Sequence, residues 1–451
     1  MKHNTIIIGA GITGLVIANE LMDKGIDPEQ ILILEKENRA GGLIATSIED
    51  GFSCEWGPEG LRGSSTNTHR VFELAGIEKI ASTEQAKIRY ILKKGKLISL
   101  PTNPIKAIFS SVLSPFGKLR LLMEPFVSPV DTDESIATFF ERRFGKGVLP
   151  LVDAFVSGIF GGNPSKLSIE HSFPPLKRAE RLKGSVIRGL MAMKKGTGQK
   201  GKRNRQPFLF TPSGGMQQLL KQLSEKVNVV YGMKVKEIKK LSNGFIILTD
   251  QNEWKAEKVV VATGIQGICN IKIEGNYPSL KPEISKVSIV SMGFTKDSFR
   301  RPPKGYGFLI PESEKKFLLG VLFTSNLFPQ KAPQNTVLLR CFVGGERHED
   351  RALMDKEELI AKVQEEVTDL LEVTKPPVYI SIQRHAPKGI PQLNLDHEFN
   401  LNWKHKIEKK FPNLYFAGIG WTSISCDGLI SEAIELAQKL TSSNNDQAMN
   451  H

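Results

Sequence analysis

The clearest pattern of apolar and polar residues in this chain lies within its first 35 residues. An apolar run at 6–8 ends in glycines, apolar residues then recur at 15, 18 and 21–22, and a second apolar run follows at 31–34. Unbroken apolar runs are typical of strands buried on both faces, and the middle spacing is helical. The pattern predicts a strand, a tight turn, a helix and a second, parallel strand.

The turn between the first strand and the helix has three glycines in the GxGxxG spacing. Gly9 allows the turn, Gly11 lets the backbone approach a pyrophosphate, and Gly14 lets the helix pack closely on the strand. Glu35 ends the second strand, where a carboxylate accepts hydrogen bonds from ribose hydroxyls. We therefore predict a dinucleotide site that contains Gly9, Gly11, Ile12, Thr13, Gly14 and Glu35.

A second loop directly after Glu35 adds an arginine and a glycine pair. These residues predict a further cradle for a pyrophosphate or a flavin edge, made of Lys36, Arg39, Gly41, Gly42 and Leu43. The spacing resembles the superfamily of FAD-dependent amine oxidases, phytoene desaturases and protoporphyrinogen oxidases. The resemblance implies FAD, bound without a covalent link.

Later segments carry further likenesses to this superfamily. The stretch 51–60 resembles the one that passes the isoalloxazine ring, and the strand after Lys258 ends in a common landmark of FAD folds. A helix from Asp427 would point its N-terminus at the flavin N1–C2=O edge. The resemblance thus implies further cofactor contacts at Gly57, Pro58, Glu59, Val235, Ala262, Thr263, Gly418, Asp427 and Leu429. The run 419–426 departs from the family's glycine-rich pattern.

The order of these segments predicts an α/β fold with a discontinuous, Rossmann-like FAD-binding domain. We assign 1–85, 206–265 and 390–445 to this domain, and 86–103 with 266–389 to a sheet-based substrate-binding domain. One clear helix, 356–371, interrupts the strands of the second domain. The remaining residues, 104–205, form a helical insertion.

The helical insertion and the net charge of +13 raise the question of a membrane surface. The segments 105–113 and 116–127 are rich in apolar residues, and 193–205 has six basic residues and no acidic one. These segments suit either buried helices with a solvated loop or contact with an anionic bilayer. Nucleic-acid binding is poorly supported, since no aromatic residues interleave the charges. We expect a cytoplasmic protein, peripheral on the inner face of the cell membrane.

Metal chemistry and covalent catalysis find little support in the sequence. The eight histidines are scattered, and the four cysteines, among them Cys426, lack paired spacing and suggest free thiols. No Ser/His/Asp triad or pair of catalytic carboxylates stands out. We predict no metal site and no catalytic acid or base among the side chains.

Several ordered blocks resemble one family within the superfamily, the protoporphyrinogen oxidases. These blocks are 155–168, 307–311, 319–329 and 341–345. The resemblance implies that Arg89 pairs with a propionate of a tetrapyrrole and that Leu309 and Phe323 give apolar contacts. Backbone carbonyls at Gly161 and Gly162 would approach the pyrrole N–H groups.

The implied reaction is the oxidation of protoporphyrinogen IX to protoporphyrin IX in haem biosynthesis, with O₂ as acceptor and H₂O₂ as product. Coproporphyrinogen III oxidation by the same chemistry stays open, as does a non-catalytic scaffold that binds FAD and a tetrapyrrole. Amine oxidation is a more distant alternative, because no aromatic cage for an amine is apparent. A homodimer is also left open.

Overall fold

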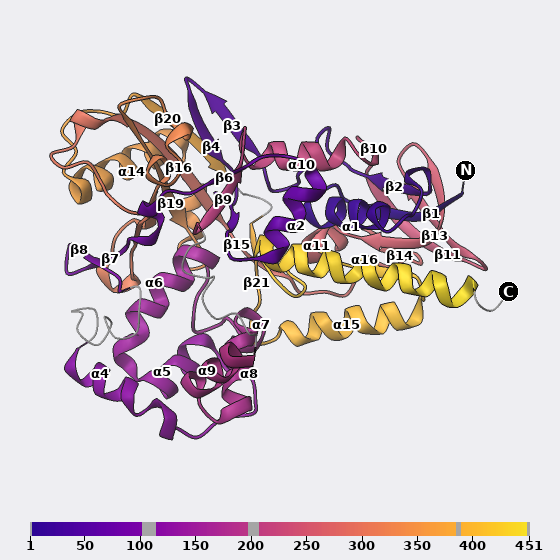
Figure 1. Cartoon of the computed structure of the whole chain (residues 1–451), viewed down its shortest axis with the longest axis horizontal. Coiled ribbons are helices and arrows are strands. Elements are labelled where there is room, and N and C mark those ends of the chain that lie inside the picture. Colours follow the sequence, from indigo (N-terminus) through magenta and orange to yellow (C-terminus); the bar gives the residue numbers. More distant parts are fainter. Residues whose placement is uncertain (1, 102–113, 197–206, 385–388, 449–451) are drawn as a thin grey trace.

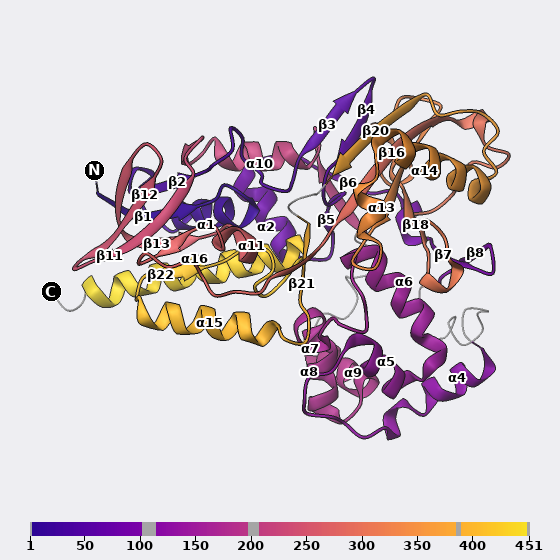
Figure 2. The ribbon, with the colours of Figure 1, turned by 180° about the vertical axis from the view of Figure 1, so that it is seen from behind.

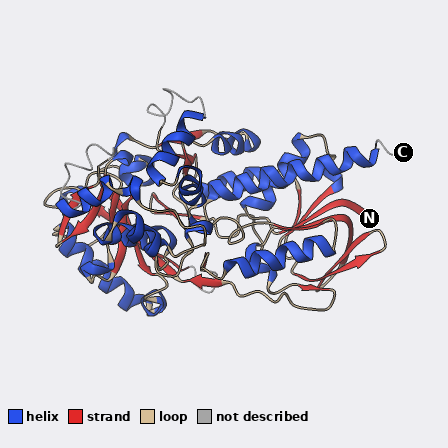
Figure 3. Ribbon diagram, turned by 90° about the horizontal axis from the view of Figure 1, so that it is seen from below, coloured by secondary structure: helices blue, strands red, loops and turns tan. Residues whose placement is uncertain are grey.

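The computed structural model describes residues 2–101, 114–196, 207–384 and 389–448. Two large sheets lie at opposite ends of the molecule, and a body of helices lies below the second one (Figure 1). Both termini lie at the end that holds the first sheet, as the view from below also shows (Figure 3).

The first sheet is built around β13, which receives strands from distant parts of the chain. β1 pairs with β13 in parallel on one side, whereas the antiparallel β12 and the parallel β22 share its other side. β1 and β2 are parallel neighbours, as the sequence pattern predicts. The eight strands are β1 (Lys2–Ile8), β2 (Ile31–Leu34), β10 (Asn228–Val230), β11 (Val235–Leu241), β12 (Gly244–Thr249), β13 (Glu253–Val261), β14 (Lys272–Ile273) and β22 (Leu414–Phe416).

Both faces of the first sheet are buried, which explains the unbroken apolar runs. Ile7 faces a core formed with α1, α2, α10 and α16, while Ile6 and Ile8 face the opposite core beside α11 and α15. The helices are α1 (Ile12–Asp23), α2 (Thr66–Ala75), α10 (Met216–Ser224), α11 (Gly264–Ile268), α15 (His397–Lys410) and α16 (Cys426–Ala448).

The second sheet has seven strands, and α14 (Lys356–Leu371), with the bounds predicted, covers one face of it (Figure 2). Its strand order is β20-β16-β19-β18-β17-β7-β8. The bounds are β7 (Arg89–Lys93), β8 (Lys96–Ser99), β16 (Val287–Thr295), β17 (Gly307–Leu309), β18 (Leu318–Phe323), β19 (Thr336–Gly344) and β20 (Tyr379–Arg384). Residues 84–87, at the start of this part of the chain, form a 3-10 turn, and the first strand begins at Arg89. The domain division stays a prediction. β14 pairs with β11 of the first sheet, although residues 272–273 lie beyond the predicted boundary at 265.

Three small sheets connect the larger parts. They are β3 (Thr46–Glu49) with β4 (Phe52–Glu55), β5 (Leu61–Arg62) with β9 (Leu209–Pro212) and β6 (Lys79–Ala81), and β15 (Glu283–Ser285) with β21 (Ile390–Gln392). Two short helices, α12 (Thr324–Leu327) and α13 (Glu349–Leu353), flank the second sheet.

The helical insertion contains α4 (Pro115–Leu122), α5 (Ile136–Phe144), α6 (Leu149–Phe160), α7 (Ile169–Ser172), α8 (Pro174–Lys183) and α9 (Val186–Gly196). The segment expected as one helix over 116–127 is divided, since α4 ends at Leu122 and a separate 3-10 turn spans Glu124–Phe126. The expected helix 105–113 and most of the basic stretch 193–205 lie outside the described residues. No described helix is long and apolar enough to cross a membrane.

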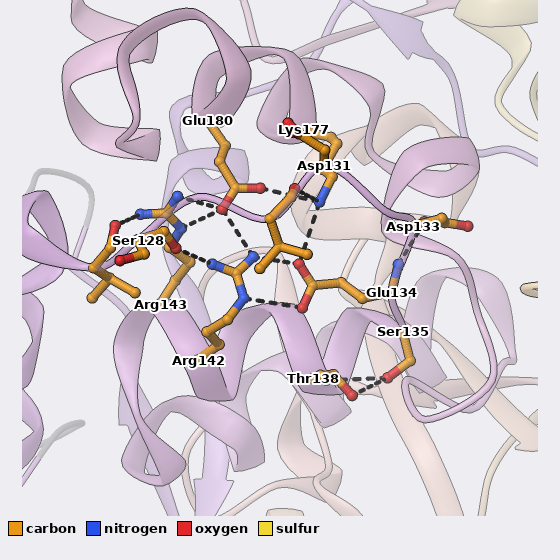
Figure 4. Close-up of polar contacts among 12 residues, drawn as sticks. Ser128, Asp131, Asp133, Glu134, Ser135, Thr138, Arg142, Arg143, Lys177 and Glu180 are labelled. Carbon is orange, nitrogen blue, oxygen red and sulfur yellow. Dashed lines mark hydrogen bonds and ion pairs between the residues drawn. The ribbon is translucent and has the colours of Figure 1, made fainter.

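A largely buried cluster of charged side chains joins the helices of this insertion (Figure 4). Its members are Glu124, Glu134, Arg142, Arg143, Lys177 and Glu180. Arg143 Nε donates to Glu180 Oε1 at 2.6 Å, and Arg143 Nη1 donates to the carbonyl of Val127 at 2.8 Å. Lys177 Nζ donates to the carbonyl of Val130 at 2.6 Å. The cluster therefore holds the irregular segment between α4 and α5 against α8.

Candidate functional site

The predicted cofactor site begins at the carboxyl edge of the first sheet, where β1 turns into α1. The Gly9 N–H donates to the Leu34 carbonyl at 2.8 Å, so the turn is tied to the end of β2. A Cβ added at Gly14 would lie 2.1 Å from the Gly9 carbonyl oxygen, whereas one added at Gly11 would meet no atom of the described residues within 4 Å. Gly14 thus permits helix–strand contact, and Gly11 leaves its backbone accessible.

α1 starts at Ile12, followed by Thr13, without a side-chain cap and without an acidic residue in its first turn. An uncapped helix N-terminus offers N–H donors and a partial positive charge, which together suit a phosphate group. The residues present therefore fit the pyrophosphate of a dinucleotide.

The Glu35 carboxylate organises the edge beside this turn. Its oxygens accept the N–H of Ala10 at 2.7 Å and the N–H of Glu37 at 2.9 Å. Because each carboxylate oxygen has a further lone pair, Glu35 retains the capacity to accept ribose hydroxyls. The Lys36 side chain is exposed and lies 3.9 Å from the Glu37 carboxylate, so only its backbone remains a candidate contact.

The second glycine loop lies against the first. The Gly41 N–H donates to the Ala10 carbonyl at 2.8 Å, and a Cβ added at Gly42 would lie 3.7 Å from the Gly11 Cα. Arg39 differs from the expected cradle, because its guanidinium donates to the carbonyls of residues 40, 42 and 44 at 2.9–3.1 Å. Arg39 therefore shapes the loop that contains Leu43.

The other candidate cofactor residues on this edge come from three distant segments. The Ala262 N–H donates to the Ile8 carbonyl at 2.9 Å, next to Thr263, and a Cβ added at Gly418 would lie 3.1 Å from the Ala262 carbonyl oxygen. Val235 begins β11 and is buried. The Met233 N–H donates to the Glu35 carbonyl at 2.8 Å, which keeps the start of β11 close to the ribose carboxylate.

The N-terminus of α16 points to the same edge. Ser65, which caps α2, donates its hydroxyl to the Asp427 carboxylate. The Leu429 side chain lies in the core between α16 and α1, so only its backbone could reach a cofactor. Burial raises the pKa of the Cys426 thiol to about 12, which disfavours the thiolate that a covalent flavin link requires.

Glu59 has a different environment from the one expected of a cofactor contact. Its buried carboxylate is 2.5 Å from Lys331 Nζ and 2.6 Å from Arg340 Nη1. Both oxygens thus pair with cations that are themselves at most 3% exposed, so the carboxylate is enclosed on the side of the second sheet. We no longer propose Glu59 as a direct cofactor contact, and its neighbours Gly57 and Pro58 remain candidates.

Strand register divides the residues of the second sheet between its two faces. Arg89 pairs with Gly307, Ile91 pairs with Leu309, and Gly320 pairs with Phe342. Paired residues of neighbouring strands point to the same side, so Arg89, Leu309, Leu322, Arg340 and Phe342 share the face opposite α14. α6 crosses this face, where a Cβ added at Gly158 would lie 2.4 Å from the Leu309 side chain.

Phe323 lies on the wrong face for the predicted substrate contact. Its side chain is 1% exposed and packs with Phe308 in the core that α14 covers. We therefore withdraw Phe323 as a substrate contact. The same register adds Leu322 and Phe342, which the sequence blocks contained but could not assign to a face.

Arg89 is a half-buried cation without a carboxylate partner among the described residues. Its guanidinium carbon lies 4.2 Å from the Phe208 ring centre and 5.5 Å from the Tyr306 ring centre. Burial lowers the pKa of Arg89, as expected for a guanidinium that pairs with no carboxylate of the described residues. Because Arg89 occupies this aromatic pair, the pair is not open to a substrate amine.

Gly161 does not have the free carbonyl that was expected. Its carbonyl oxygen accepts the Ser285 hydroxyl at 2.6 Å and the Glu346 N–H at 2.7 Å, which uses both lone pairs. A Cβ added at Gly162 would lie 2.3 Å from Gln392 Oε1, so this glycine permits close packing between α6 and β21. We therefore interpret the two glycines as a joint between the helical insertion and the sheets. The described residues also contain no cluster of side chains that could hold a metal ion.

Comparisons with known sequences show which family the chain resembles. Residues 12–440 match the model of the flavin containing amine oxidoreductase family. The mitochondrial protoporphyrinogen oxidase of Nicotiana tabacum is 32% identical, over 91% of this chain and 89% of that protein. The coproporphyrinogen III oxidase of Staphylococcus aureus is 27% identical, over 98% and 99%.

A solved structure supports the fold. A protein of Exiguobacterium sp. 255-15 superposes with a TM-score of 0.79 and 20% identity, covering 98% of this chain and 99% of the other. The chain belongs to the flavin-containing amine oxidoreductase family, and it is an FAD-dependent oxidoreductase.

Proposed function

We propose that this protein oxidises protoporphyrinogen IX to protoporphyrin IX, with three O₂ consumed and three H₂O₂ formed per porphyrin. The observation that carries the proposal is Arg89, a guanidinium with no carboxylate partner in the described ranges, on the sheet face that also presents Leu309 and Phe342. A tetrapyrrole has carboxylates at its edge and a broad apolar surface, which match this combination. The relatives named for porphyrinogen oxidation support the same substrate class.

In this proposal, the described side chains bind and orient the substrate. Arg89 forms a charge-assisted pair with one propionate, and the rings of Phe208 and Tyr306 hold the guanidinium in place. Leu309 and Phe342 exclude water from the macrocycle face. FAD, held by the two glycine loops and Glu35, supplies the acceptor for hydride. The pyrrole N–H protons pass to water, so no side chain is assigned as acid or base.

Substituting Arg89 tests the propionate contact. Arg89→Leu should raise KM for protoporphyrinogen about 10- to 100-fold, since one charge-assisted hydrogen bond is worth about 1.5–3 kcal/mol. FAD content should remain unchanged. Arg384→Leu is a matched control, because Arg384 is an exposed arginine of the same sheet on the edge strand β20. Unchanged KM in Arg89→Leu, or loss of FAD with KM intact, would contradict the assignment.

Coproporphyrinogen III is the second candidate substrate, and the near-complete match to the S. aureus relative favours it. We would follow anaerobic bleaching of the flavin with protoporphyrinogen IX and coproporphyrinogen III in parallel. Faster bleaching by the first, with porphyrin fluorescence after air is admitted, supports the main proposal. Preference for the second would move the enzyme to coproporphyrin formation. Tight FAD binding with no bleaching by either would indicate a scaffold.

We also propose peripheral contact with the cytoplasmic face of an anionic membrane through the apolar surface of α4 and the following turn. Phe116 and Phe126 are 85% and 81% exposed, and Leu119, Leu122 and Met123 are exposed beside them. Exposed apolar patches of this kind commonly mark interaction sites. Neighbouring basic side chains such as Arg188, which lies 5.9 Å from the Phe126 ring centre, favour anionic lipids.

A double variant, Phe116→Asp with Phe126→Asp, should lose binding to vesicles that contain phosphatidylserine. Tyr277→Asp is the control, because Tyr277 is an exposed aromatic residue that follows β14 of the first sheet. Equal binding of both variants to these vesicles would refute the proposal that α4 and the following turn contact the membrane. The homodimer remains a proposal. Light scattering in solution would test it, because a dimer has twice the molar mass of the chain.

A further inference from the structure

Four buried charged side chains lie between the loop 55–59 and the second sheet. Glu55 and Glu59 belong to the loop, whereas Lys331 follows α12 and Arg340 lies in β19. All four are at most 6% exposed. Two cations balance two carboxylates, so the cluster is neutral as a whole. The substrate contacts proposed above make no use of it.

The ion pairs of this cluster connect the loop 55–59 to the second sheet and to the turn that flanks it. Lys331 Nζ lies 2.9 Å from Glu55 Oε1 and 2.5 Å from Glu59 Oε1, and Arg340 Nη1 lies 2.6 Å from Glu59 Oε2. Burial disfavours ionisation of Glu59, but the attraction of Lys331 and Arg340 holds its pKa below the usual value. Burial likewise opposes the charge of Lys331, while Glu59 and Glu55 raise its pKa. Glu59 and Lys331 are therefore ionised near neutral pH.

Arg340 also fixes the backbone of the loop. Its Nη2 donates to the carbonyl of Glu55 at 2.7 Å and to the carbonyl of Gly57 at 3.0 Å. Lys331 Nζ lies 3.3 Å from the carbonyl of Glu59. The carbonyls of alternate residues 55, 57 and 59 thus all turn toward the second sheet.

The other side of the loop meets the second glycine loop. The Trp56 N–H donates to the Ala45 carbonyl at 2.8 Å, and a Cβ added at Gly57 would lie 3.5 Å from the Leu43 carbonyl oxygen. Loop 55–59 is therefore held between cations of the substrate sheet and a loop that belongs to the cofactor site.

We propose that Arg340, held by Glu59, is a positioning residue that sets the place of Gly57 and Pro58 beside the flavin. Arg340 acts through the loop backbone and touches neither cofactor nor substrate. Through this residue, the substrate sheet controls the affinity and the electronic environment of FAD. The proposal rests on FAD as the cofactor and is independent of which porphyrinogen is oxidised.

The test compares Arg340→Leu and Arg340→Lys with the unchanged protein, without substrate. Arg340→Leu should raise the dissociation constant of FAD at least about tenfold and shift the flavin absorption bands, because two backbone carbonyls lose their donor. Arg340→Lys retains the positive charge but loses the planar guanidinium that donates to two carbonyls at once. It should therefore have an intermediate effect on the dissociation constant of FAD and on the flavin absorption bands. Unchanged FAD affinity and spectrum in both variants would overturn the proposal.

Arg143→Leu is the matched control, because Arg143 is an equally buried arginine paired with carboxylates in the helical insertion. It should lower thermal stability while leaving FAD affinity and spectrum unchanged. An equal loss of FAD affinity in Arg143→Leu and Arg340→Leu would show general destabilisation and overturn the proposal.

The double variant Arg340→Leu with Glu59→Leu distinguishes the effect of an unpaired Glu59 carboxylate from the effect of Arg340 on the position of the loop. It leaves Glu55 paired with Lys331 and the cluster neutral, so thermal stability should recover relative to Arg340→Leu. FAD affinity should stay low, since the loop carbonyls still lack their donor. Recovery of FAD affinity together with stability would overturn the positioning role.

Discussion

Gly11, which precedes α1, and Gly14, which lies within α1, should respond in opposite ways to the same added methyl group. Gly11 has φ −73° and ψ 177°, which any residue adopts, and its added Cβ would have no described neighbour within 4 Å. Gly11→Ala should therefore fold normally, and should stabilise the flavin-free protein by up to about 1 kcal/mol by restricting the unfolded chain.

The cost of Gly11→Ala should appear in cofactor binding. The methyl group would occupy the space through which the backbone approaches the pyrophosphate. Losing one charge-assisted hydrogen bond costs about 1.5–3 kcal/mol, which corresponds to about 10- to 100-fold weaker FAD binding.

Gly14→Ala should instead damage the fold. Its Cβ would lie 2.1 Å from the Gly9 carbonyl oxygen and 3.2 Å from the Ile7 side chain, so α1 must move away from β1. Overpacking of this kind costs about 1–3 kcal/mol.

The assay is urea unfolding of flavin-free protein together with FAD titration followed by fluorescence quenching. Destabilisation of Gly11→Ala by more than about 1 kcal/mol, or FAD binding equal to that of the unchanged protein, would refute the reasoning. Gly14→Ala with unchanged stability would refute the role of close helix–strand contact.

Two further predictions concern the second sheet and the helical insertion. Phe342→Leu should change KM for the porphyrinogen, whereas Phe323→Leu should lower only stability, and steady-state kinetics with thermal unfolding of both variants distinguishes the two faces. Burial opposes ionisation of Glu180, but hydrogen bonds from Arg142, Arg143 and Lys177 hold its pKa below 4.5. The resulting stability is present above pH 4.5 and is lost as the pH falls through the lowered pKa, so the stability difference between the unchanged protein and Glu180→Gln should shrink there. A difference that stays constant down to pH 3 in urea unfolding would contradict this.

The first strand–turn–helix unit was predictable because its signals are local. The apolar runs of β1 and β2, the glycine spacing and Glu35 all lie within 35 residues and follow from backbone sterics and burial. α14 was predictable for the same reason, since its apolar stripe repeats at helical spacing over 16 residues.

The predictions that were wrong concern residues whose environment depends on strands or side chains far away in the sequence. Phe323 and Leu322 are neighbours in sequence, and only the register of β18 with β19 shows which of them faces the substrate side. The partners of Glu59 lie more than 270 residues away, so their ion pairs could not be read from local pattern. The sequence does contain one signal, because Arg340 interrupts the apolar run that follows Thr336 in β19.

The central position of β13 has a consequence for synthesis of the protein on the ribosome. β1 and β2 emerge first, but β1 must wait for β13, whose pairing residues lie about 230 positions after those of β2. At a translation rate of roughly 5–20 residues per second, this delay is on the order of 10 to 50 s. β22 arrives later still, at residues 414–416, and completes the edge that carries Gly418. The nascent chain should therefore expose the free outer edges and apolar faces of β1 and β2 to chaperones, and should acquire FAD only after nearly all of the chain has been made.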